Sequence, residues 1–135
     1  MRIIFGIFTS LVTAGLILLT AQMLREGLFP KPFFIPESQV PLMNEWIATW
    51  KTNVYFLIGV SHGLAAFSAG LISSLVTVQS RMTAGVVAVC IVFIPVMVYL
   101  FTYTFPVLFV VADTVATAIL GFLGISIGST RYSGY

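Results

Sequence analysis

Four long apolar stretches, joined by one long polar segment and two short connections, set the pattern of this chain. The apolar stretches cover residues 3–24, 54–78, 82–103 and 105–129. A helix rises about 1.5 Å per residue, so about 20 residues suffice to cross a hydrocarbon core of about 30 Å. The pattern therefore predicts an all-α integral membrane protein, a four-transmembrane-helix bundle with a long interfacial loop between its first and second helices.

The first apolar stretch has a competing interpretation as a signal peptide, because a basic residue, Arg2, precedes it. The apolar core of a signal peptide is about 7–15 residues long. The stretch over 3–24 is longer than that, so we expect it to be a retained transmembrane helix.

Composition agrees with a membrane protein. Of the 135 residues, 59% are hydrophobic and 7% are charged, whereas a soluble domain carries about 25% charged residues. We expect a single transmembrane domain over residues 1–135. The six scattered bases do not form a nucleic-acid-binding surface. The lone Cys90 excludes an intramolecular disulfide, and we expect it to be a small buried hydrophobe.

The segment 25–53 is the long polar connection, and it holds six of the ten charged residues and four of the prolines. Its end, 41–50, can form a short helix that carries Trp46 and Trp50. Tryptophans just before a transmembrane helix are typical of the aromatic belt at a membrane interface. We therefore predict that both are interface anchors, with a lid over the bundle as the alternative.

The second and fourth apolar stretches each carry small residues at helical spacing. Small residues let helix backbones approach closely where lipid provides no hydrophobic drive for association. We expect these two seams at the centre of the bundle or at a contact between subunits. Their members are Gly59, Gly63, Ala66 and Gly70 in the second stretch, and Thr117, Gly121, Gly124 and Gly128 in the fourth.

His62, the only histidine, and Asp113, the only acid within the apolar stretches, fall beside these seams. Both helices enter the membrane from the same side, which places the two side chains at one depth, roughly 10–14 Å from that side. A lone aspartate in hydrocarbon costs about 2.5–3.5 kcal/mol. We therefore predict an intramembrane polar pair. It is either a structural lock between two helices or a proton-relay or substrate site.

Other chemistry finds no support in the residues. Bis-histidine haem ligation needs a second histidine, and Cys90 with His62 is too small a set for a metal site. Neighbouring Ser61 and His62 point about 100° apart on a helix, which disfavours a catalytic triad with Asp113. We predict no enzyme activity, no metal and no cofactor, and leave a bound lipid, quinone or pigment open.

Orientation follows from loop charge only weakly, because cytoplasmic loops carry the excess of Lys and Arg. Three bases fall on each side: Arg2, Arg81 and Arg131 with the termini, and Arg25, Lys31 and Lys51 with the long loop. The short turn at Arg81 favours termini inside, in a bacterial cytoplasmic (inner) membrane.

Three stretches carry a resemblance to a known group: IPESQVP leading through LMNEW, SHGLAAFSAGLISSL, and FPVLFVVADTVATAILGFLG. They resemble the uncharacterised small four-span integral membrane proteins of Bacteroidetes-type bacteria. Phe109 stands where that group leads us to expect a tryptophan–phenylalanine pair. The resemblance supports the pairing of His62 with Asp113 and implies no activity.

Small size, the lack of a catalytic cluster and the two seams favour an accessory or structural subunit of a larger bacterial membrane complex, such as a respiratory or energy-transducing one. Its partners would be membrane lipids and other membrane subunits or further copies of the chain, and no nucleic acid. The alternative is a small oligomeric proton-coupled transporter that uses the His62–Asp113 pair. A lipid-modifying enzyme is a third and weaker hypothesis.

Overall fold

The computed structural model describes residues 1–130, and that part of the chain is all-helical, with five helices and no strand. The helices are α1 (Arg2–Leu28), α2 (Val40–Ala48), α3 (Thr52–Val76), α4 (Arg81–Thr102) and α5 (Val107–Thr130). All except α2 are long and apolar enough to cross a membrane. The predicted all-α class with four long apolar helices is thus confirmed. Arg131 lies outside the described residues.

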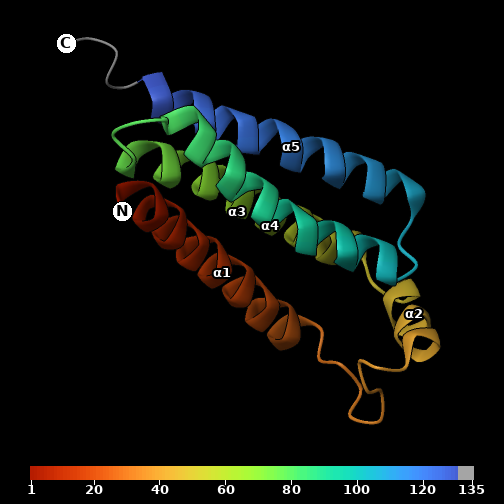
Figure 1. Ribbon diagram of the computed structural model, residues 1–135. Helices are drawn as coiled ribbons and strands as arrows, with labels where there is room; N and C mark the ends of the chain where they lie inside the picture. The colour runs from red at the N-terminus through yellow and green to blue at the C-terminus, as the bar shows by residue number, and fades with distance from the viewer. Residues whose placement is uncertain (131–135) are drawn as a thin grey trace.

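The four long helices lie side by side, and the short α2 lies at one end of the bundle, opposite the N-terminus (Figure 1). Helix α3 is central, since it packs against α1, α4 and α5, and α5 is its most extensive partner. Helix α1 continues to Leu28, so the helix covers the first residues of the expected loop 25–53. The prolines that stop it begin only at Pro30, because a residue before proline is disfavoured in the α conformation.

Helices α3 and α5 approach each other closely through glycine. A Cβ atom added at Gly70 would lie 2.6 Å from the carbonyl oxygen of Gly121. One added at Gly124 would collide with the Phe67 carbonyl oxygen, and one at Gly128 would lie 2.7 Å from the Leu71 carbonyl oxygen. The obstacles are backbone atoms, which cannot move aside as a side chain can. The small residues of the two helices therefore set the distance between them.

Helix α1 packs through its own small face. Gly6, Ser10 and Ala14 are its buried residues along the first four turns. Ala14 belongs to a cluster with residues from α3 and α4, namely Ala65, Ala69, Ala88 and Val92. Cys90 is exposed, contrary to the expectation that it is buried. Buried Ala88 and Val92 stand one helical turn apart, so Cys90, midway between them, points the opposite way.

Trp46 and Trp50 pack inside the protein at the α2 end of the bundle, and their role as interface anchors stays a prediction. Trp46 and Trp50 are buried, at 8% and 6% exposure, and their rings meet edge to face with centroids 5.1 Å apart. They belong to an apolar cluster with Ile47, Val54 and other residues at the α2 end of the bundle. Helix α2 turns its apolar face inward, with Met43, Trp46 and Ile47 buried. The aromatic pair thus packs within the α2 end of the bundle.

We expect Gly124→Ala to destabilise the protein, because its Cβ would be forced into the α3 backbone. Overpacking of a closed core costs about 1–3 kcal/mol. The matched control is Gly15→Ala, in α1, where an added Cβ meets nothing within 4 Å. Thermal unfolding in mild detergent should show a lower midpoint temperature for Gly124→Ala than for the wild type, and an unchanged midpoint for Gly15→Ala. Equal midpoints would contradict the close α3–α5 contact.

Candidate functional site

A buried His62–Asp113 pair joins α3 to α5. His62 Nδ1 lies 2.6 Å from Asp113 Oδ2, and the two residues are 6% and 3% exposed. The other carboxylate oxygen, Oδ1, accepts a longer hydrogen bond of 3.4 Å from the Thr117 hydroxyl one turn later on α5. The structure thus brings together the two polar residues that the sequence singles out.

The pair leaves one nitrogen of the imidazole free. An ionised carboxylate only accepts hydrogen bonds, so Nδ1 of a neutral His62 must carry the proton that it donates to Asp113. Nε2 is then an acceptor with a lone pair, and it makes no hydrogen bond within the described residues. The pair can therefore take up a proton at Nε2 without losing the bond to Asp113.

The glycines around the pair are not equally constrained. A methyl group at Gly59 would lie 3.6 Å from Asp113 Oδ1, which is an ordinary contact. At Gly63 it would meet the end of the Leu120 side chain, which can move. Gly70 and Gly124, further along α3 and α5, meet backbone instead. Backbone contacts at Gly70 and Gly124, C-terminal to His62 and Asp113 on their helices, thus fix the close approach of α3 and α5. Around His62 itself the two helices are less tightly constrained.

His62 borders a cavity of about 310 Å³ between α1, α3 and α4. The floor combines His62 and Ser61 from α3 with Tyr99 from α4, whose ring lies edge to face with the imidazole at 6.0 Å. The rim carries the exposed residues Gln22 and Glu37. Apolar walls complete it, with Leu18, Ile58 and Val96 among them. The cavity therefore leads from an exposed rim to the buried pair.

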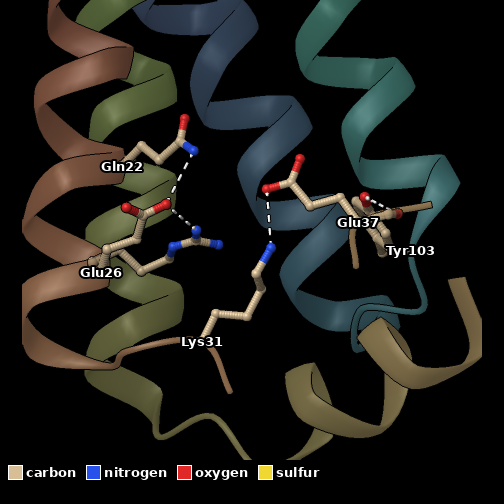
Figure 2. Close-up of polar contacts among 6 residues, drawn as sticks. Gln22, Glu26, Lys31, Glu37 and Tyr103 are labelled. Atoms are coloured by element: carbon tan, nitrogen blue, oxygen red, sulfur yellow. Dashed lines mark hydrogen bonds and ion pairs between the residues drawn. The ribbon is translucent and has the colours of Figure 1, made fainter. Parts of the chain in front are cut away.

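Polar contacts hold the rim together, as Figure 2 shows. The Gln22 side chain donates to Glu26 at 3.2 Å on the α1 side. Lys31 pairs with Glu37 at 3.4 Å, and the Tyr103 hydroxyl donates to the Glu37 carbonyl oxygen at 3.5 Å. The first contact lies within α1, the second within the connection before α2, and only the third joins that connection to the end of α4.

Arg25 is the most unusual residue of the cavity. It is 8% exposed, and its guanidinium lies over both tryptophan rings, 5.3 Å from the centroid of Trp46 and 5.5 Å from that of Trp50. Its one ion pair is a 3.5 Å contact with Glu26, and its Nε has no hydrogen-bond partner within the described residues. Tyr99 lines the same cavity as Arg25. A buried cation with unused donors thus lines the same cavity as His62.

Sequence reasoning missed Arg25, because it was assigned to the long loop and only its charge was used. A signal was available. Arg25 follows Ala14 by three helical turns, so it continues the small, inward face of α1. Tyr99 offered no comparable signal, since its position at the cavity depends on how α4 packs against α1 and α3.

The described residues contain no group of three or more His, Cys, Asp or Glu side chains that could hold a metal ion.

Comparisons with protein-family models, with curated proteins and with solved structures found no significant match to this chain. The chemistry of the site must therefore be argued from its own geometry.

The tautomer of His62 can be measured directly, because it is the only histidine. In nitrogen-15 spectra of histidine-labelled protein recorded over a pH series, we expect the neutral form of the imidazole to carry its proton on Nδ1 and not on Nε2. In Asp113→Asn the amide can itself donate to the ring, so this preference should weaken. Thr117→Val, which removes only the longer bond to Asp113, should keep the wild-type pattern. A proton on Nε2 in the wild type would contradict the arrangement.

Proposed function

We propose that this chain is an integral membrane protein in which α1, α3, α4 and α5 each span the bilayer. The support is their length and apolar composition, together with the many large hydrophobic side chains that they expose. The connection from α1 to α3, with α2, would lie at the membrane interface opposite the termini. The termini would face the cytoplasm of a bacterial cell.

We further propose that it is a small proton-coupled carrier, with the His62–Asp113 pair as its proton-binding group. The observation that carries this proposal is the buried pair at 2.6 Å whose free nitrogen belongs to a residue lining a cavity with an exposed rim. Intramembrane ionisable residues that face a cavity mark proton and substrate pathways. A pair that served only to lock two helices would need no cavity beside it.

Proton uptake changes the charge of the pair without breaking it. With neutral His62 and ionised Asp113 the pair carries one negative charge, and with imidazolium it carries none. Coulomb interactions are strong in a medium of low dielectric constant, so the loaded and unloaded pair differ greatly in their preference for a nearby charge. Such a difference is what couples a proton to a charged substrate.

The role of accessory or structural subunit remains a prediction. Its main support was the pair of small-residue seams, which exceeds what one helix contact requires. Contact of the α3 seam with the α5 seam accounts for both within a single chain, so the seams no longer argue for a further subunit. The size and composition of the particle purified in mild detergent would test this role. Fixed, unlike protein partners would favour the subunit role. A particle that holds only this chain, alone or in several copies, would favour the carrier.

The carrier is tested in proteoliposomes loaded with a pH-sensitive dye. Under an imposed solute gradient, we expect protein-dependent proton movement that Asp113→Asn reduces at least about tenfold, because the amide cannot hold the charge that retains the proton. Ser68→Ala, also on α3 but bonded only to its own backbone, is the matched control and should keep wild-type flux. Full proton movement in Asp113→Asn would overturn the proposal.

A further inference from the structure

We infer that the cavity binds a small organic carboxylate anion, held by Arg25 and accompanied by one proton on His62. This names the substrate class of the proposed carrier and rests on that proposal for its proton. Three observations carry it: Arg25 is buried and its Nε has no hydrogen-bond partner within the described residues, Tyr99 and His62 line the same cavity as Arg25, and only Nδ1 of His62 is bonded to Asp113.

The guanidinium supplies the anion specificity. Arginine presents donors in a planar fork that matches a carboxylate, often with two parallel hydrogen bonds. The partners of Arg25 leave that capacity largely unused. Its contact with Glu26, at 3.5 Å, is longer than the usual range of about 2.7–3.2 Å. The two tryptophan rings attract the cation through their faces, but rings accept no hydrogen bond in the plane of the fork.

The tyrosine connects the two ends of the site. Tyr99 lies beside the imidazole of His62, at a ring distance of 6.0 Å, and it lines the same cavity as Arg25. An anion in this cavity would therefore lie among the guanidinium, the tyrosine and the imidazole. Apolar Leu18, Ile58 and Val96 would contact the body of the ligand. A volume of about 310 Å³ lies at the small end of ligand pockets, which start at about 300 Å³.

Charge balance explains why the proton accompanies the anion. We take His62 as neutral in the empty site, so that the site holds one positive charge on Arg25 and one negative charge on Asp113. In the loaded site the carboxylate cancels Arg25, while the imidazolium cancels Asp113. Binding the anion alone, or the proton alone, would leave an uncompensated charge within the bundle, which is costly in a medium of low dielectric constant.

The remaining charges near the cavity lie in contact with solvent. Glu37 is paired with Lys31 at 3.4 Å, and its side chain is 64% exposed. The Glu26 side chain is 50% exposed. Exposed pairs of this kind are screened and contribute little. The balance inside the cavity is therefore set by Arg25, Asp113, His62 and the ligand.

Calorimetry on the full chain in nonionic detergent tests the inference, with benzoate as the probe and the isosteric, uncharged benzamide as its control. We expect benzoate to bind with uptake of one proton, measured by repeating the titration in buffers of different ionisation enthalpy. We expect benzamide not to bind. Binding of benzamide as tight as that of benzoate would overturn the inference.

Variants separate the specific role of the Arg25 guanidinium in binding from the effect of positive charge in general. Arg25→Gln should weaken benzoate binding at least about tenfold, the factor expected when a charge-assisted hydrogen bond is lost. Lys51→Gln removes a positive charge next to α3 outside the cavity and should change affinity less than about twofold. If Arg25→Gln does not fold, Arg25→Lys keeps the charge without the fork, and unchanged affinity in it would contradict bidentate binding.

The outcomes distinguish this inference from the proposed function. Benzoate binding that requires Arg25 but takes up no proton supports the carboxylate site and overturns the proton coupling. Proton movement in proteoliposomes without benzoate binding overturns the site and keeps the carrier. Phosphatidylglycerol, added to the detergent, tests whether the site instead binds the anionic headgroup of a lipid. If it binds in an Arg25-dependent manner and benzoate does not, the site belongs to a lipid headgroup and the inference is overturned.

Discussion

The backbone contact between α3 and α5 is the constraint on which the rest of the structure depends. Gly70, Gly124 and Gly128 let the two helices approach until backbone meets backbone. At that separation the side chains of His62 and Asp113 span the interface with a 2.6 Å hydrogen bond. A wider interface would leave Asp113 in apolar surroundings with its negative charge uncompensated. The contact that joins the two helices is thus also the one that orients the imidazole of His62.

The other walls of the cavity are held less firmly. Half of the apolar stretch of α3 is buried, whereas only 17% of that of α1 is. Helix α1 is held by a narrow small face and by Arg25 over the two tryptophans. The α1 wall of the cavity therefore depends on fewer buried residues than α3 does.

The sequence predicts the helices well and the end of the bundle poorly, for physical reasons. Apolar length alone identifies the four long helices, and counting residues along two of them places His62 and Asp113 at one depth. The positions of the small residues indicate which face of each helix packs against the other, and His62 and Asp113 lie beside those faces. No such periodic signal distinguishes a tryptophan at a membrane interface from one folded back onto the bundle, since both environments suit an indole ring. The places of Trp46 and Trp50, and with them the surroundings of Arg25, depend on tertiary packing at the α2 end.

The two buried charges of the bundle do not pair with each other. Arg25 and Asp113 have opposite charges and belong to the same bundle, yet each has its own partner: Glu26 and the tryptophan rings for Arg25, His62 for Asp113. Removing water from two separate charges is costly, and each is compensated only by its own partners. Arg25 and His62, the partner of Asp113, line one cavity. The proposed anion, bound together with a proton, would supply a further partner to each of the two charges.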